Sequence, residues 1–179
     1  QVVTQSKSLP PIFWGAAAHQ IAASRFLQEF PGKFNRVRVH IQNHLAGHPF
    51  NQLARFIAES EQPPSALISA SAIGYYGDRG SSPLTEDAGP GRDFLAELSE
   101  EWEKEALAAR SSRTRVVLLR TGIVLDPREG ALAKMLTPFQ MYAGGPFGSG
   151  RQFMSWIHRD DWVSLAKWAI ETPAARGPP

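Results

Sequence analysis

Hydroxyl-bearing side chains gather in one stretch of the sequence, SALISASAIGYYGDRGSSPLTED, at residues 65–87. The stretch begins with an apolar run typical of a buried strand, and Ser69 and Ser71 lie at the end of this run. Two neighbouring phenols, Tyr75 and Tyr76, follow. Serine hydroxyls and phenols can bind a ligand by hydrogen bonds and can transfer protons. The stretch therefore predicts a ligand site, and the alternative is an ordinary strand-to-loop exit whose aromatic rings cap the core.

A βαβ unit is expected to position these hydroxyl groups. Apolar runs at 66–68 and 116–119 are typical of strands buried on both faces of a parallel sheet. The segment between them has apolar residues four positions apart and predicts a helix, whose apolar stripe consists of Phe94, Leu98, Trp102 and Ala106. In open α/β sheets, ligands bind beyond the carboxyl ends of the strands, where residues 69–71 are expected.

Other segments also predict regular structure. Residues 36–41 alternate like a strand, and residues 50–60 have the apolar spacing of a helix that ends before Pro63. The pattern at residues 1–5 is compatible with a strand, and residues 13–34 are expected to be helical in their middle. Another helix is expected from the acidic pair at 160–161, with an apolar face made of Val163, Ala166, Trp168 and Ile170. No internal repeat or domain boundary is evident, so residues 1–179 are interpreted as a single domain.

The composition narrows the class of protein. With 179 residues, 42% hydrophobic and 20% charged, the chain fits one ordinary domain with a sizeable core. The absence of cysteine excludes disulfides, thiolate metal sites and cysteine nucleophiles. No uninterrupted apolar run reaches the roughly 18 residues of a membrane span, and the first residues lack the order of a secretory signal. A cytoplasmic protein without membrane contact is expected.

Two patterns suggest other functions, and each has a simpler interpretation. Arg110, Arg113 and Arg115 form the densest basic patch, which is typical of a nucleic-acid footprint. They follow a predicted helix, where cations complement the helix dipole, so no nucleic-acid partner is predicted. Histidines four residues apart would line one helix face as metal ligands, and these are His40, His44 and His48. That segment alternates like a strand and contains Gly47 and Pro49, so no metal site is predicted.

Five motifs together resemble one protein family. They are SASAIGYYGD, LTED, DFLAELSEEWEKEA, VVLLRTGIVLD and GGPFGSGRQFMSWIHRDDWV. They are similar to motifs of the atypical extended short-chain dehydrogenase/reductases, and more narrowly of the sugar-nucleotide epimerase-like branch, whose members are often named epimerase family protein. The similarity covers residues 63–179, with a weaker match at HLAGHP. It implies a Rossmann-type α/β fold, a doubly wound parallel sheet that binds NADP, with NAD as the alternative cofactor.

The resemblance also implies which residues contact the cofactor. In the first part of the chain, Lys7 or Ser6 would face a ribose 2′-phosphate, and the turn after the fourth strand would consist of Leu45, Ala46 and Gly47. Near the nicotinamide, the resemblance places Ser69, Ala70 and Ser71. The turn after the sixth strand would consist of Arg120, Thr121, Gly122, Ile123 and Val124.

Catalytic and substrate-binding residues are implied in the same way. Ser71 would take the place of the superfamily's catalytic serine or threonine, and Tyr75 or Tyr76 would be the substitute proton donor. The segment that approaches the substrate would contribute Arg151, Trp156 and His158. The alternatives are a surface ion pair for the arginine, core packing for the tryptophan and a helix-entry hydrogen bond for the histidine. Arg151 is the preferred candidate, because an arginine flanked by glycine suits a pyrophosphate or carboxylate.

The sequence departs from the superfamily at the catalytic pair. Standard members place a tyrosine and, four residues later, a lysine on one helix, so that the ammonium activates the phenol. The tyrosines of this chain are followed at that spacing by Arg79, Gly80 and Pro146. The expected helix instead presents Phe94 and Leu98, which cannot transfer protons.

A second departure is the missing phosphate cradle. A dinucleotide site needs a glycine-rich turn at a helix N-terminus after the first strand, and the sequence contains no such turn. We therefore expect the chain to begin near the second strand of the sheet and to lack the C-terminal substrate-binding part of extended members.

The sequence thus favours an NAD(P)-dependent enzyme of the short-chain dehydrogenase type, an epimerase or oxidoreductase. Its expected partner is a small molecule with a carbonyl or carbinol group, such as a nucleotide-sugar, and the protein is expected to be a monomer or homodimer. The alternative is a non-catalytic module that binds or senses a dinucleotide on a degenerate scaffold.

Overall fold

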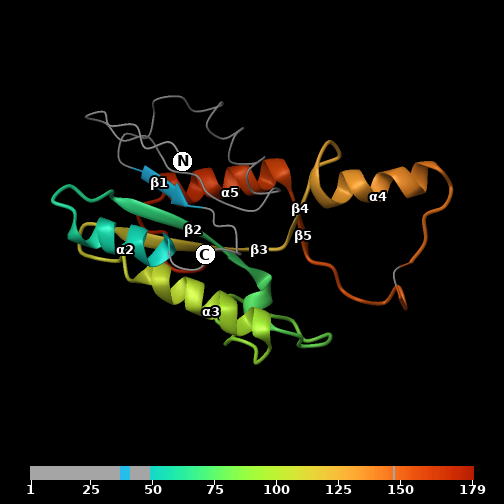
Figure 1. Ribbon diagram of the computed structural model, residues 1–179, viewed down its shortest axis with the longest axis horizontal. Helices are drawn as coiled ribbons and strands as arrows, with labels where there is room; N and C mark the ends of the chain where they lie inside the picture. Colours follow the sequence, from blue (N-terminus) through green and yellow to red (C-terminus); the bar gives the residue numbers. More distant parts are fainter. Residues whose placement is uncertain (1–36, 41–48, 147) are drawn as a thin grey trace.

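A computed structural model describes residues 37–40, 49–146 and 148–179, and Figure 1 shows their arrangement. The elements in chain order are β1 (Val37–His40), α2 (Pro49–Glu59), β2 (Ala66–Ala72), the short 3₁₀ helix η1 (Ile73–Tyr76), α3 (Phe94–Leu107), β3 (Arg115–Thr121), β4 (Ile123–Leu125), α4 (Gly130–Gln140), β5 (Trp156–His158) and α5 (Arg159–Glu171). The strand and helix predicted at 1–5 and 13–34 lie outside the described residues.

A parallel sheet forms the centre of the fold. Its order is β1-β2-β3, which confirms the strands predicted at 36–41, 66–68 and 116–119. In this register, Leu67 lies opposite Val116 and Ser71 lies opposite Arg120. The two βαβ crossovers place α2 and α3 against the same face of the sheet, as right-handed connections in one direction require. The sheet is parallel, as the strands' nearly uninterrupted apolar runs predict.

Two hydrophobic clusters, one on each face, hold the layers together. The first joins the sheet to α5 and includes Ile68, Val117 and Trp162. The second joins it to α2 and α3 and includes Leu67 and Ile57. Figure 1 shows α5 on one side of the sheet and α2 and α3 on the other. Successive residues of a strand point to opposite faces, so β2 and β3 contribute residues to both clusters. Helices on both faces make the sheet doubly wound, as predicted.

The apolar stripe predicted for α3 is wrong. Phe94 is 73% exposed, and the residues that α3 buries are Ala96, Ser99, Glu103 and Ala106. These residues are also three to four positions apart, so they share another face of the same helix. Small side chains let α3 approach the sheet closely, and β3 supplies a partner for the buried carboxylate of Glu103. Of the predicted stripe, only Ala106 is fully buried.

The helix predicted near residue 160 is confirmed as α5. Its buried face contains Val163, Ala166 and Ile170, as predicted, but Trp168 is exposed and Trp162 is buried instead. The Trp162 indole donates a hydrogen bond to the Thr121 hydroxyl, over 3.0 Å, which satisfies its polar atom inside the core.

A long connection that contains α4 separates β4 from β5 in the sequence. These two short strands pair in parallel, and α4 lies in the connection between them. Figure 1 shows α4 extending away from the central sheet, and none of its residues is fully buried. The sequence analysis did not predict α4. No helix among the described residues is long and apolar enough to span a bilayer.

Two arginines of the basic patch, Arg113 and Arg115, bind backbone carbonyl groups. Arg113 donates to the carbonyl oxygen of Glu61, just beyond α2, over 2.8 Å. Arg115 donates to the carbonyl oxygen of Ile170, at the end of α5, over 2.7 Å. Burial, followed by the charge of Arg176, lowers the pKa of the Arg115 guanidinium. These contacts give the two arginines a structural role at helix ends.

Candidate functional site

A buried polar cluster lies at the carboxyl ends of β2 and β3, on the face that α3 covers. The register places Ser71 beside Arg120, and α3 supplies Glu103. The Ser71 hydroxyl donates to Oε1 of Glu103 over 2.5 Å. The Arg120 guanidinium binds both carboxylate oxygens of Glu103 over 2.8 Å, through Nε and Nη2. Side chains from β2, β3 and α3 therefore meet at one carboxylate, which accepts three hydrogen bonds.

The remaining donors of Arg120 point to the tyrosine pair. Its Nη1 donates to the Tyr76 phenol oxygen and to the backbone oxygen of Glu86, each over 2.9 Å. Its Cζ lies 3.6 Å from the centre of the Tyr75 ring, a cation–π contact. Burial by itself lowers the pKa of Arg120, but the hydrogen bonds to Glu103 and Tyr76 outweigh it and raise the pKa above its ordinary value. Arg120 is therefore a fixed cation.

The turn after β2 sets the positions of both phenols. Strand β2 passes directly into η1. The residue that follows η1 is Gly77, which has a φ of 65°. This positive φ suits glycine, because it has no Cβ to clash. The returning loop passes close by: Gly91 donates its N–H to the Tyr75 carbonyl oxygen over 2.8 Å. A Cβ on Gly91 would lie 2.7 Å from the Gly77 Cα, so no larger residue fits there.

A pocket of about 1070 Å³ opens beside this cluster. Its walls come from the loop at 77–86, from β3 and from the segment at 151–155. Tyr76, Arg120 and Arg151 line it, so the pocket brings together three of the residues that the sequence predicts for the site. A cavity of this size suits a cofactor or a drug-sized ligand.

The arginines that line the pocket differ in what they can still bind. The Arg79 side chain binds backbone oxygens of Tyr76, Gly89 and Pro90, and Arg120 binds Glu103. The Arg151 guanidinium is exposed and has no side-chain partner within the described part of the chain. It is therefore the pocket arginine best placed to receive an anion.

Several predicted site residues do not line this pocket. Ser69 is buried, and its hydroxyl bonds to the Ala70 carbonyl oxygen. Thr121 accepts from Trp162, as described above. A Cβ on Gly122 would lie 2.6 Å from the Ser155 carbonyl oxygen, so this glycine allows β4, from Ile123 onward, to approach the chain before β5. The residues whose side chains lie outside the pocket lining also include Ser71, Tyr75, Trp156 and His158.

His158 has a structural contact at the entry to α5. Its Nδ1 accepts the backbone N–H of Asp160 over 3.2 Å, which is the helix-entry hydrogen bond weighed as the alternative. Of the histidines considered as metal ligands, His40 lies in strand β1, as the alternation predicts. His44 and His48 lie outside the described residues, as do the predicted cofactor contacts Lys7, Leu45, Ala46 and Gly47.

Glu103 is the site residue that the sequence analysis missed. It lies in an acidic helix, SEEWEKEA, where a glutamate is normally exposed. A signal was available: Glu103 shares one helix face with Ala96, Ser99 and Ala106, and a face of small residues suits close contact with a sheet. The sequence analysis predicted burial of the apolar stripe instead, because hydrophobic residues are the usual guide to the buried face of a helix.

Comparisons with known proteins show clear relatives. An Arabidopsis thaliana protein named "Epimerase family protein SDR39U1 homolog, chloroplastic" is 48% identical over 118 residues, 66% of this chain and 34% of that protein. Epimerase family protein YfhF from Bacillus subtilis is 34% identical over 149 residues, 81% of this chain and 49% of that protein. The chain thus spans between a third and a half of the length of these relatives. No protein-family model matches it.

Solved structures share the fold. The nucleoside-diphosphate sugar epimerase from Corynebacterium glutamicum matches 94% of this chain and 46% of its own, with a TM-score of 0.77 and 29% identity. The human epimerase family protein SDR39U1 (isoform2), solved with NADPH, also has a TM-score of 0.77, at 24% identity, and matches 94% of this chain and 72% of its own. These similarities confirm the Rossmann-type α/β fold predicted from the sequence.

Proposed function

Because the chain is a relative of the epimerase family proteins and has a Rossmann-type fold, we propose that it is part of an NAD(P)-dependent, epimerase-like oxidoreductase. The substrate class we propose is a small molecule with a carbinol or carbonyl group, for which a nucleotide-sugar is the leading candidate. The cytoplasmic location stays a prediction, since the plant relative is named chloroplastic.

The observation that carries this proposal is the pocket at the carboxyl ends of β2 and β3. Ligands of open α/β sheets bind in this region, and here one tyrosine and three arginines line the pocket. The volume of about 1070 Å³ accommodates a nicotinamide group together with a substrate. A pocket with an acid–base group and an anion-binding group suits redox chemistry on a phosphorylated small molecule.

NADP is the proposed cofactor, with NAD as the alternative. When bound, such a cofactor supplies or accepts a hydride. The described residues fit its nicotinamide end, because Tyr76 and Arg120 offer a phenol and a fixed cation in a roomy pocket. The contacts proposed with its remaining parts involve Lys7, the turn at 45–47 and the strand ends at 69–71 and 120–123. NADPH in the human relative supports this choice.

Arg151 is the proposed anchor for the substrate. An exposed guanidinium with unused donors binds a diphosphate or a carboxylate by paired hydrogen bonds. Contact of Trp156 and His158 with the substrate remains a proposal, because these two residues are not among those that line the pocket. Ser71 is proposed to act through Glu103 and Arg120, to which its hydroxyl connects, and not by direct contact.

A non-catalytic binding module is the second candidate. The described residues favour it in one respect: the hydroxyl of Ser71 is buried on a carboxylate and does not face the pocket. The sequence also lacks the tyrosine–lysine pair of standard members. In this case the pocket would hold a nucleotide without turnover.

Calorimetric titration of the intact gene product with NADPH, NADP and NAD in parallel tests the proposal. We expect dissociation constants in the micromolar range or below and a preference for the phosphorylated forms. UDP-glucose is then titrated into the NADP complexes of the wild type and of two variants. Arg151→Met is expected to weaken UDP-glucose binding, and Arg110→Met, an exposed arginine outside the pocket, serves as the matched control.

Each result has a defined meaning. No heat with any dinucleotide, from a folded protein, would reject cofactor binding and with it the proposed function. Binding without hydride transfer to or from any substrate probe would favour the non-catalytic module. Equal UDP-glucose affinity in the two arginine variants would reject Arg151 as the anchor.

A further inference from the structure

We propose that Tyr76 is the proton-transfer residue of the pocket and that Arg120 is its positioning residue, in place of the lysine that standard members carry. This inference rests on the proposed function, and it adds how that function works without a Tyr-x-x-x-Lys motif. The replacement comes from the neighbouring strand β3 and not from a helix, which is why the sequence spacing did not reveal it.

Tyr76 and Arg120 are in direct contact at the edge of the pocket. Tyr76 lines the pocket and is only partly buried, so a ligand can reach its phenol. Its oxygen accepts a hydrogen bond from Nη1 of Arg120 over 2.9 Å. The phenol proton is not used in that bond, so it is available to a ligand oxygen.

Tyr76 differs from its neighbour Tyr75 in its contacts. Tyr75 is not part of the pocket lining, and it contacts Arg120 through its ring face, at 3.6 Å from the ring centre. The two rings are nearly perpendicular, at 88°, with their centres 5.4 Å apart. The two tyrosines therefore have different positions: the Tyr75 ring covers the guanidinium, whereas Tyr76 lines the pocket and its phenol oxygen binds the guanidinium.

Arg120 is held rigidly by its partners. Glu103 binds one edge of the guanidinium through two hydrogen bonds, and the side chains of Arg120 and Glu103 are only 8% and 7% exposed. The Ser71 hydroxyl fixes the carboxylate in turn, and the Glu86 carbonyl oxygen shares Nη1 with Tyr76. A donor held in this way needs no reorganisation when charge appears on the phenol oxygen.

The chemistry that follows is a reversible proton transfer. In the direction of carbonyl reduction, a reduced nicotinamide, the cofactor class of the proposed function, would supply a hydride that forms the new C–H bond at the carbonyl carbon, and the π electrons of the C=O bond would move to the oxygen. The carbonyl oxygen then takes the phenol proton as the O–H bond of Tyr76 breaks. The resulting phenolate is stabilised by the Arg120 N–H, because hydrogen bonds from a charged donor to an anion are strong. Water in the open pocket returns a proton to Tyr76.

The test compares variants of the intact gene product, all saturated with cofactor. They are Tyr76→Phe, Tyr75→Phe, Arg120→Lys and the double variant Arg120→Met/Glu103→Met. The double variant removes the buried ion pair as a whole and avoids leaving an unpaired charge, so it is expected to stay folded. Two quantities are measured for each: the dissociation constant of NADPH, by calorimetry, and the single-turnover loss of NADPH absorbance with phenanthrenequinone. UDP-glucose with NADP probes the reverse direction.

We expect Tyr76→Phe to slow the single turnover by about a hundredfold to ten-thousandfold, the usual contribution of general acid–base catalysis, with an unchanged NADPH affinity. Tyr75→Phe keeps its ring and is expected to leave the rate unchanged. Arg120→Lys keeps a cation, so it should retain part of the rate that the double variant loses. A purely structural role of Arg120 would not produce this rescue at constant cofactor affinity.

Three results would overturn the inference. One is an equal rate for Tyr76→Phe and Tyr75→Phe, and the second is an equal rate for Arg120→Lys and the double variant. Either of these results, in a wild-type protein that turns over a probe, rejects the inference and leaves the proposed function standing. The third is a wild-type protein that binds NADPH but neither reduces nor oxidises any probe, which also favours the non-catalytic module. A wild-type protein that binds no dinucleotide rejects cofactor binding and the proposed function, so the failures are distinguishable.

Discussion

At the scale of single residues, the buried pair of Glu103 and Arg120 decides what the site can do. Removing two charges from water costs several kcal/mol for each ion, and only complete hydrogen bonding compensates for this cost. The carboxylate accepts from Ser71 and twice from Arg120, and the guanidinium also donates to Tyr76 and Glu86. The result is a pair that fixes side-chain positions at the edge of the pocket.

Loss of one partner of this pair should destabilise the protein strongly. Glu103→Ala leaves the Arg120 cation buried without its carboxylate, and we expect the free energy of unfolding to fall by about 3–5 kcal/mol. Glu105→Ala, two residues further along α3 and exposed, is the matched control and should change stability by less than about 0.5 kcal/mol. Urea denaturation followed by circular dichroism measures both. Equal stability of the two variants would contradict a closed, desolvated pair.

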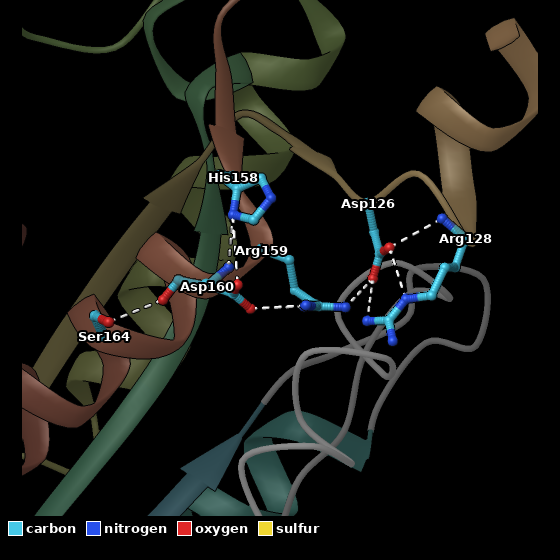
Figure 2. Close-up of polar contacts among 6 residues, drawn as sticks. All are labelled: Asp126, Arg128, His158, Arg159, Asp160 and Ser164. Atoms are coloured by element: carbon cyan, nitrogen blue, oxygen red, sulfur yellow. Dashed lines mark hydrogen bonds and ion pairs between the residues drawn. The ribbon is translucent and has the colours of Figure 1, made fainter.

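At the scale of elements, a second buried ion pair joins β4 to the start of α5. Figure 2 shows Arg159 reaching Asp126 from the first turn of the helix, and both side chains are almost fully buried. Hydrogen bonds to Asp160, and then to Asp126, raise the pKa of the Arg159 guanidinium. Acidic residues in the first turn of α5 also complement the helix dipole. These contacts hold α5 against the point where the chain leaves towards α4.

Two arginines bound to the same carboxylate allow a controlled comparison. Arg159→Met should destabilise the protein by about 3–5 kcal/mol, because it leaves the buried Asp126 without its internal cation. Arg128 binds Asp126 from a side chain that is 62% exposed, so Arg128→Met should cost less than about 1 kcal/mol. Denaturant unfolding of the two variants measures the difference. A larger loss for Arg128→Met would mean that the exposed arginine is the main partner of Asp126.

At the scale of the whole molecule, burial is uneven. The central strands β2 and β3 supply residues to both hydrophobic clusters, whereas α4 has no fully buried residue. Local stability follows the amount of buried apolar surface, so the described residues at 127–146 and 148–155 are held less firmly than the sheet. The pocket lies between these two regions, because the sheet supplies Arg120 and the outer segment supplies Arg151.

Hydrogen exchange should show this difference in the 179-residue chain. We expect the amides of β2 and β3 to exchange most slowly, through global unfolding, and those of α4 to exchange much faster, through local opening. Mass spectrometry of peptic fragments after deuterium labelling measures both. Helix α3, which is similarly long but buries four residues, is the internal control. Protection of α4 equal to that of α3 would contradict the expectation.

Local sequence patterns were sufficient to predict most of the helices and strands, though not α4, and to reveal the family resemblance. Strands β1, β2 and β3 and helices α2, α3 and α5 follow from local patterns of apolar residues, which reflect the geometry of the backbone. The motifs near residues 69–77, 116–126 and 144–163 pointed to the epimerase-like proteins because these motifs are short, local and specific.

Only the tertiary structure decided which face of α3 is buried and which groups meet at the pocket. Ser71, Glu103 and Arg120 are far apart in the sequence, and their contacts arise from the register of β2 with β3 and from the rotation of α3 about its axis. A sequence pattern fixes the period of a helix but not which of two candidate faces meets the sheet, because that choice depends on the partners across the interface. Burial of the Glu103 carboxylate is favourable only because Arg120 is positioned to bind it.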